Sequence, residues 1–311
     1  DGPAIHAQGP GDHLGERRLS RAVVPDDGSD EAGAELRVHV PSARLYGSGD
    51  AYGHALAGLA RERGGDLGGT SGRISGSGDQ PGPRRPKERG EASPRGFRER
   101  DDDGRDADPS DNGDSADADV CYQGSEARPS SWHGSHVAGI IAASTNNERG
   151  VAGVAPNARI LPVRALGRCG GTSTDIIDAL TWASGGHVNG VPDNDNPAQV
   201  INMSLGGTGT CPAFYQKAID AAVERGSIIV AAAGNEDVDA GGVAPAGCQN
   251  VITVGATGAT GARSFYSNYG SVVDVSAPGG DPNTDDGIAS TVDRSETTPQ
   301  EPAYGYMMGT S

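Results

Sequence analysis

The stretch Val200-Ile201-Asn202-Met203-Ser204-Leu205-Gly206-Gly207 is an apolar, β-branched run that ends in glycines. This composition predicts a strand. Residues 212–225 come next, and apolar side chains recur in them at helical spacing, at Ala218, Ile219, Ala222 and Val223. A second apolar run fills residues 227–233. Strand, helix and strand in this order indicate parallel strands that are buried on both faces.

The same alternation extends on both sides of this unit. We predict helices at residues 136–143 and after the capping residue Thr172, and strands at 158–164, 251–254 and 272–275. The pattern therefore predicts an α/β fold of three layers around a mostly parallel central sheet.

Charge is distributed unevenly along the 311 residues. The net charge is −17, from 42 acidic and 25 basic side chains, and residues 1–98 hold 14 of each kind. Residues 99–311 therefore carry all of the excess negative charge. An acidic domain argues against nucleic acid and anionic membrane surfaces as partners. No run of about 18 apolar residues is present, so we predict no membrane span.

Residues 1–98 differ in composition from the rest of the chain. Leu, Ile, Val and Phe make up about a seventh of this stretch, below the level at which a core usually forms. Two short apolar runs, 36–40 and 55–60, are the exceptions. We expect a low-complexity region here, either disordered or translated from a wrong reading frame. Residues 99–311 are expected to form the folded domain.

Four cysteines, Cys121, Cys169, Cys211 and Cys248, lie far apart after residue 120. An even count without a C-x-x-C pair favours two disulfides over a zinc site. Four cysteines allow three pairings, which the spacing alone does not separate. Disulfides predict an oxidising compartment and thus a secreted protein; buried thiols in a cytosolic protein are the alternative.

Three residues have the chemistry that acyl transfer by serine requires, namely a nucleophile, a base and an oxyanion donor. Ser311 follows Gly309-Thr310, a small and flexible approach to a hydroxyl. His133 begins an apolar helix after a polar loop, so its imidazole can reach a cleft. Asn235 follows a strand at Ala233-Gly234, and α/β sheets place their sites at strand ends. Each has an ordinary explanation as a cap or turn residue, but their order and separation together favour a catalytic site.

Substrate binding is expected at the same strand ends. Main chain at Ser204, Leu205 and Gly206 can pair with an extended peptide as an added strand. The small residues Gly206, Ala233 and Gly234 favour a roomy pocket for a large apolar side chain.

Residues from about 99 to 311 resemble the subtilisin-like serine peptidases (subtilases), in the secreted bacterial branch with an Asp-rich loop before the histidine. The matching segments are Ser131-Trp132-His133-Gly134-Ser135-His136-Val137-Ala138-Gly139, Gly150-Val151-Ala152-Gly153-Val154-Ala155-Pro156, Val200 to Gly207, Ala231 to Asn235 and Gly309-Thr310-Ser311.

The resemblance implies a role for each matched residue in a serine endopeptidase that acts on proteins or peptides as a monomer. His133 is implied to be the general base, Ser311 the nucleophile and Asn235 the oxyanion donor. Chain order and the resemblance together favour the disulfides Cys121–Cys169 and Cys211–Cys248.

Two departures from the family pattern lead to a second hypothesis. The family has an apolar strand ending in Asp-Thr/Ser-Gly upstream of the histidine, and residues 1–132 contain no such segment. Asp50, Asp66 and Asp79 sit among glycines, and we assign none of them. The family's serine also opens a long helix, so the fold is expected to be incomplete at the C-terminus and the 311-residue chain alone to be unstable or inactive. The alternative function is therefore an inactive fragment or pseudopeptidase that only binds peptides.

The acidic segment 101–111 resembles a calcium loop. Asp101, Asp103, Asp106, Asp108 and Asp111 alternate around a glycine, which suits a hard cation that takes six to eight oxygen ligands. We expect structural calcium here; a solvated acidic loop is the alternative.

Two rival chemistries fit the sequence less well. His133 and His136 could share a helix face as zinc ligands, but no H-E-x-x-H pattern is present. The glycines in residues 167–171 do not form the G-x-G-x-x-G of a nucleotide-binding fold.

Overall fold

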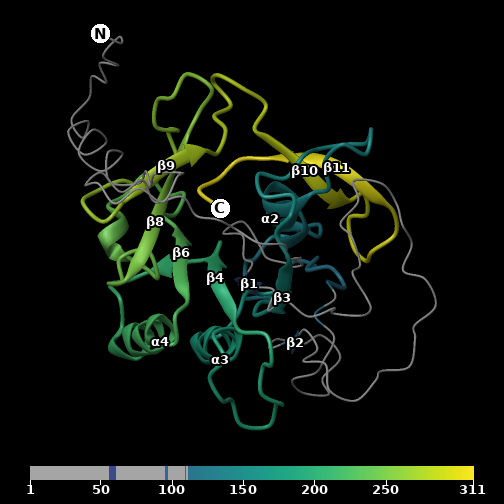
Figure 1. Ribbon diagram of the computed structural model, residues 1–311. Helices are drawn as coiled ribbons and strands as arrows, with labels where there is room; N and C mark the ends of the chain where they lie inside the picture. Colours follow the sequence, from purple (N-terminus) through teal and green to yellow (C-terminus); the bar gives the residue numbers. More distant parts are fainter. Residues whose placement is uncertain (1–55, 61–94, 97–108, 110) are drawn as a thin grey trace, which may run out of the picture.

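The computed structural model describes residues 56–60, 95–96, 109 and 111–311 (Figure 1). Their centre is a seven-stranded sheet in the order β2-β3-β1-β4-β6-β8-β9. The strands are β1 (Leu56–Ala60), β2 (Arg95–Gly96), β3 (Ile160–Arg164), β4 (Ala198–Met203), β6 (Ile228–Ala232), β8 (Val251–Thr257) and β9 (Val275–Pro278).

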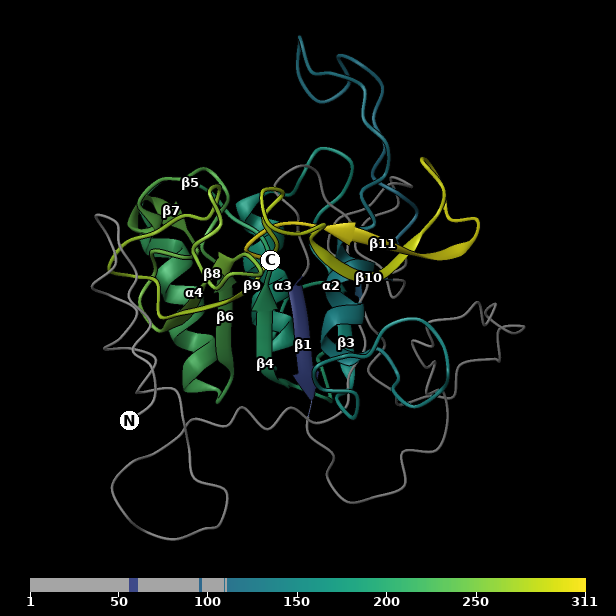
Figure 2. The same cartoon turned by 90° about the horizontal axis from the view of Figure 1, so that it is seen from above.

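The central sheet is mostly parallel, which confirms the predicted fold class. β4, β6, β8 and β9 pair in parallel, as do β2 and β3. β1 is the exception, because it lies antiparallel to both β3 and β4, and Figure 2 shows its arrow reversed relative to β4. β1 and β2 both come from the low-complexity stretch 1–98.

Two faces of the sheet are covered by different helices, which makes three layers (Figure 1). The helices are α2 (His133–Ala142), α3 (Ser173–Ala183) and α4 (Ala213–Glu224). Because side chains alternate along a strand, Ile201 and Ile229 join the cluster under α3 and α4, whereas Val200 joins the cluster under α2. Burying each such aliphatic side chain contributes about 1.5–3 kcal/mol, so both layers stabilise the sheet.

Local signals fix the ends of α3 and α4. The Thr172 hydroxyl accepts a hydrogen bond from the N–H of Asp175 at the start of α3, as the capping pattern predicts. Gly185 and Gly226 follow the two helices with φ of 86° and 97°, left-handed values that glycine adopts without strain. The predicted helices at these places are therefore confirmed to within a few residues.

A hairpin that the sequence did not indicate packs on α2. Its strands are β10 (Ile288–Asp293) and β11 (Pro302–Met307). The hydroxyls of Ser290 and Thr291 donate to the carbonyls of His136 and Ser135, at 2.6 and 2.8 Å. The hairpin then leads directly into Gly309-Thr310-Ser311, so it connects α2 to the C-terminal segment.

Some strand positions differ from the predictions. The strand expected at 272–275 begins only at Val275, because residues 270–273 form a turn with the Val273 N–H bonded to the Gly270 carbonyl. A short two-stranded sheet, β5 (Gly207–Thr208) with β7 (Val243–Ala244), was not predicted. The 3-10 turn η1 (Ala240–Gly242) precedes β7.

Two disulfides crosslink the domain, Cys121–Cys169 and Cys211–Cys248. These are the pairs that chain order and the family resemblance favour. Among the described residues, no helix is long and apolar enough to cross a membrane.

His136, on the second turn of α2, is only 2% exposed. Its Nε2–H donates to the Ile288 carbonyl at 2.9 Å. Burial lowers the pKa of His136, and main-chain hydrogen bonds with Ile288 and Gly305 oppose that shift only in part. His136 is therefore a buried residue whose Nε2 is engaged by the main chain, as expected for a structural role.

We expect His136 to make the fold less stable in mild acid. A depressed folded pKa contributes stability above the ordinary histidine value of about 6.5, and that contribution is lost as the pH falls toward the folded pKa. The slope from one proton is at most about 1.4 kcal/mol per pH unit. Chemical denaturation at several pH values should show a shallower decline for His136→Asn than for the wild type.

His187 provides a control of opposite sign. Its exposed imidazole bonds to Asp193, which raises the pKa of His187, so its contribution is present in acid and lost as the pH rises. His187→Asn should not flatten the decline. Equal slopes for wild type and His136→Asn would show that His136 is not the titrating group.

Candidate active site

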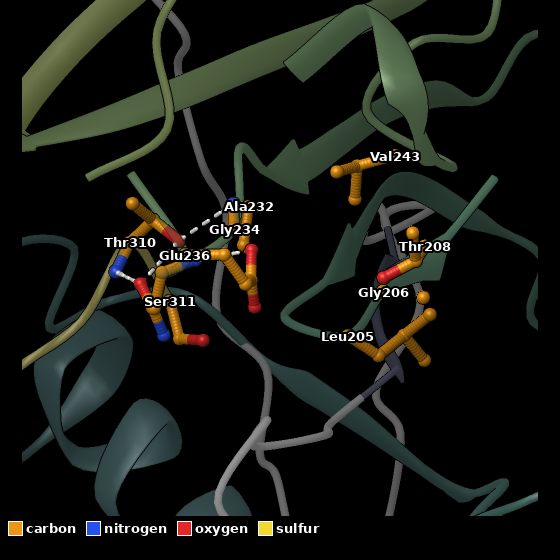
Figure 3. A pocket seen from close by; sticks show the side chains of 11 residues that line it. Leu205, Gly206, Thr208, Ala232, Gly234, Glu236, Val243, Thr310 and Ser311 are labelled. Atoms are coloured by element: carbon orange, nitrogen blue, oxygen red, sulfur yellow. Dashed lines mark hydrogen bonds between the residues drawn. The ribbon is translucent and has the colours of Figure 1, made fainter. Parts of the chain in front are cut away.

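A cavity of about 250 Å³ opens at the carboxyl ends of β4 and β6, the edge where parallel sheets place their sites. Figure 3 shows two facing walls. One wall holds the β6 end together with the C-terminal segment, and the other holds the residues after β4 together with Val243. The lining residues are Leu205, Gly206, Gly207, Thr208, Ala232, Gly234, Asn235, Glu236, Val243, Thr310 and Ser311.

Ser311 lies at the end of β4, 107 residues after Ser204 in the chain. The hydroxyl of the buried Ser204 donates to the Ser311 carbonyl at 2.9 Å and accepts from Asn202 Nδ2 at 2.9 Å. Ser204 therefore holds the main chain of Ser311 in place through this hydrogen bond. It does not line the cavity, whereas Leu205 and Gly206 do.

Thr310 orients the side chain of Asn235. Asn235 Oδ1 accepts hydrogen bonds from both the N–H and the hydroxyl of Thr310, each at 2.9 Å. The Thr310 hydroxyl also accepts from the Gly234 N–H at 3.0 Å. Since Oδ1 is engaged in this way, the Nδ2 of Asn235 is the end of the amide that can donate to a ligand.

Gly309 lies beside the side-chain amide of Asn235. A methyl group on Gly309 would lie 3.3 Å from Asn235 Nδ2 and 3.8 Å from Ser311 N. The Gly309 N–H is itself held by the Gly279 carbonyl at 3.0 Å. Glycine at position 309 therefore leaves the space beside the Asn235 amide free of a side chain.

His133 is the first residue of α2, and it does not line this cavity. The residue before it, Trp132, has φ of 52°, a left-handed value that costs a non-glycine residue about 1 kcal/mol. Trp132 is buried, and its indole N–H donates to the Ser295 carbonyl at 2.6 Å. These contacts offset the strain and turn the chain so that His133 starts the helix.

Ala233 needs a correction, because its side chain is not in the cavity. It is fully buried against Ala240, Val243 and Ala246. Neighbouring residues on a strand face opposite sides, so Ala232 lines the cavity instead. Sequence reasoning also missed Val243, which comes from a distant segment, and Glu236, which the glycine-asparagine turn conceals.

A second cavity of about 340 Å³ lies on the other side of the Leu205–Thr208 segment. Its far wall includes Cys169, Gly170 and Tyr215. The Cys121–Cys169 disulfide therefore attaches the segment before α2 to the edge of this cavity. The two cavities share one wall and together flank the strand end at which a peptide was expected to pair.

Only one of the five acidic-loop residues, Asp111, lies within the described residues; Asp101, Asp103, Asp106 and Asp108 lie outside them. Asp111 is buried, and its Oδ1 accepts from the Gly113 N–H at 2.8 Å. Nearby Asp114 is fully buried, and burial raises the pKa of its carboxyl. The described part of the chain contains no group of three or more His, Cys, Asp or Glu side chains able to hold a metal.

β1 lies between β3 and β4, antiparallel to both, and its sequence Leu56-Ala57-Gly58-Leu59-Ala60 contains no aspartate. Asp50, Asp66 and Asp79 lie outside the described residues. No orienting carboxylate for His133 is therefore assigned.

A family comparison identifies the chain. The model of the subtilase family matches residues 24–311. The chain belongs to the subtilase family. The match begins within the low-complexity stretch and ends at Ser311.

Two similar proteins are named as extracellular proteases. The chain is 52% identical over 212 residues to an extracellular protease of Xanthomonas campestris pv. campestris, covering 68% of this chain and 36% of the relative. It is 50% identical to an extracellular basic protease of Dichelobacter nodosus, covering 68% of this chain and 35% of the relative. This subtilase chain therefore spans about a third of the length of these relatives.

A solved structure supports the subtilase fold. The chain is similar to a solved structure described as proteases from Pseudoalteromonas arctica PAMC 21717. The TM-score is 0.67 and the sequence identity 47%, and the match covers 70% of this chain and 66% of the other.

Proposed function

We propose that the protein is a serine endopeptidase that hydrolyses peptide bonds through an acyl-enzyme on Ser311. The observation that carries the proposal is that Ser311 and Asn235 line one cavity, with Thr310 fixing the asparagine amide. Membership of the subtilase family adds independent support.

In the proposed mechanism, Ser311 Oγ attacks the scissile carbonyl while His133 accepts the hydroxyl proton. Asn235 Nδ2 donates to the oxygen as negative charge develops on it. His133 then gives the proton to the leaving amine, and a water molecule hydrolyses the ester by the same steps. Main chain at Leu205 and Gly206 pairs with the extended substrate, and Ser204 holds the Ser311 carbonyl behind the site.

Hydrolysis of a peptide anilide with phenylalanine before the scissile bond tests the proposal. The full-length gene product should release the aniline, because the cavity with Leu205, Val243 and several glycines suits a large apolar side chain. Binding of the peptide without cleavage would instead support the peptide-binding alternative, which no observation on the described residues favours.

We expect Asn235→Ala to lower kcat by about 10²–10³-fold with KM within about twofold, because the lost donor acts mainly on the transition state. Steady-state kinetics on the peptide anilide measure both constants. The exposed Asn157, outside the cavity, serves as control, and Asn157→Ala should leave both unchanged. A loss confined to KM would assign Asn235 to substrate binding.

We also propose that calcium binds the acidic loop, with Asp111 as one ligand and Asp101, Asp103, Asp106 and Asp108 as the others. The buried Asp114 supports a cation nearby, because its Oδ2 accepts no hydrogen bond within the described part of the chain. A bound calcium ion would supply positive charge and hold the loop before α2 in place.

Removal of calcium should lower the melting temperature. At a hundredfold excess over Kd, a ligand adds about 2.7 kcal/mol, or about 5–10 °C for a domain of this size. Thermal unfolding with EGTA, calcium or magnesium should show protection by calcium alone. Asp111→Asn should reduce that protection, whereas exposed Asp117→Asn should not. Equal melting temperatures in EGTA and calcium would remove the proposed site.

Secretion is the location that the two disulfides support, and the relatives above are named as extracellular proteases. We propose that residues 99–311 carry the functional residues of the peptidase, and that the protein acts as a monomer on protein or peptide substrates without nucleic-acid or membrane partners.

A further inference from the structure

Asn268 is 1% exposed. Its side chain forms hydrogen bonds with residues before and after Asn235 at the end of β6. Its Oδ1 accepts hydrogen bonds from the N–H groups of Glu236 and Val238, each at 3.0 Å. Its Nδ2 donates to the Ala233 carbonyl at 2.9 Å and to Glu236 Oε2 at 2.8 Å. The whole hydrogen-bonding capacity of the amide is therefore spent on this one segment.

Two further hydrogen bonds, one to the Glu236 carboxylate and one from the Asn268 main chain, fix the backbone at Asn235 and Gly234. Glu236 Oε2 accepts from the Asn235 N–H at 2.9 Å, and the Asn268 N–H donates to the Gly234 carbonyl at 2.9 Å. Gly234 has φ of 105°, and a Cβ there would collide with the Asn268 amide and the Glu236 carboxylate. The bend that presents Asn235 is thus built around the Asn268 side chain.

Asn235 is consequently held from two directions. Thr310 fixes its side-chain amide, and Asn268 with Glu236 fixes its backbone. Neither Asn268 atom lines the cavity. A donor stabilises an oxyanion well only when its position is fixed before the reaction. The hydrogen bonds that fix the backbone at Asn235 can therefore stabilise the transition state although Asn268 does not contact the substrate.

We propose that Asn268 is the positioning residue of the oxyanion donor. It holds residues 233–238 in the bend that directs Asn235 Nδ2 to the developing oxyanion. This inference rests on the proposed function and deepens it. It names a residue, 33 positions after Asn235, that fixes the position of the oxyanion donor.

Asn268→Asp is the sharpest test, because it preserves size and the acceptor oxygen but removes both donor hydrogens. The new carboxylate would face the Ala233 carbonyl and the Glu236 carboxylate, and the resulting repulsion should loosen the bend. In the full-length gene product we expect kcat to fall about 10–100-fold with KM within about twofold.

A double-mutant cycle separates positioning from general stability. In an Asn235→Ala background, Asn268→Asp should change kcat by less than about twofold, because its effect passes through Asn235. Asn194 offers a matched control: it is 6% exposed, its Nδ2 donates to the carbonyls of Trp182 and Ala183, and its Oδ1 accepts from Asn196. Asn194→Asp should lower the melting temperature and leave kcat unchanged in both backgrounds.

The outcomes are distinct. An equal kcat loss from Asn268→Asp in both backgrounds, or no loss in either, would overturn the inference while the proposed function stands. Full activity of Asn235→Ala or Ser311→Ala would overturn the proposed function and the inference with it. If Asn268→Asp does not fold, exposed Glu236→Ala replaces it in the same cycle, with a kcat loss of about tenfold expected only when Asn235 is present.

Discussion

Ser311→Ala is expected to lower kcat for a peptide anilide by about 10⁶-fold, a size taken from subtilisin itself. The variant removes only the attacking oxygen. The hydrogen bond from Ser204 reaches the Ser311 carbonyl, not its side chain, so the fold and substrate binding should be retained. Circular dichroism and the affinity for an uncleaved peptide measure these two properties.

Ser276, exposed on β9, is the control for this substitution. Ser276→Ala should have full activity. If Ser311→Ala retained even a hundredth of the wild-type kcat, another residue would have to be the nucleophile, and the mechanism proposed for this cavity would be wrong.

His133→Ala is expected to lower kcat by a similar factor, about 10⁶-fold, because serine is a weak nucleophile unless a base accepts its proton. The double variant with Ser311→Ala should be no slower than either single variant, since the two residues act as one unit. Steady-state kinetics on all three variants test this non-additivity.

The exposed His187 is the control for the loss of a histidine, and His187→Ala should leave kcat unchanged. Independent losses that multiply in the double variant would mean that His133 and Ser311 do not act in the same step. The role of the general base would then pass to another group.

In this family an aspartate orients the catalytic histidine. In subtilisin its removal alone costs about 3 × 10⁴-fold in kcat. The sequence upstream of His133 contains no segment of the form that carries this aspartate. The wild-type kcat therefore tests whether a carboxylate orients His133. A kcat lower by that factor than the kcat of other subtilases would mean that none does.

Much of the fold could be predicted from residues 158–254, because β-branched runs and capped amphipathic helices are local signals. The hairpin β10–β11 could not, since its strands include Gly305 and Pro302 and their pairing depends on packing against α2. The run Val272–Val275 was placed too early because β-branched residues also occur in turns.

Local motifs led to Ser311, His133 and Asn235 as site residues; Ser311 and Asn235 line the cavity, and His133 does not. The supporting contacts of the site could not be predicted in this way. Ala232 and Ala233 are the same residue type, but their side chains lie on opposite sides of the strand. Ala232 lines the cavity and Ala233 packs in the core. The sequence around Asn268 did not indicate its role, because its four side-chain hydrogen bonds join segments that meet only in the folded chain.

Covalent labelling tests the central claim most directly. A fluorophosphonate reacts with an activated serine as Oγ bonds to phosphorus and fluoride leaves, so a single adduct can be mapped by tandem mass spectrometry. We expect the full-length gene product to carry the adduct on Ser311, and we expect His133→Ala to slow its formation severely. An unlabelled Ser311 in folded protein, or an adduct on a different serine, would contradict the account.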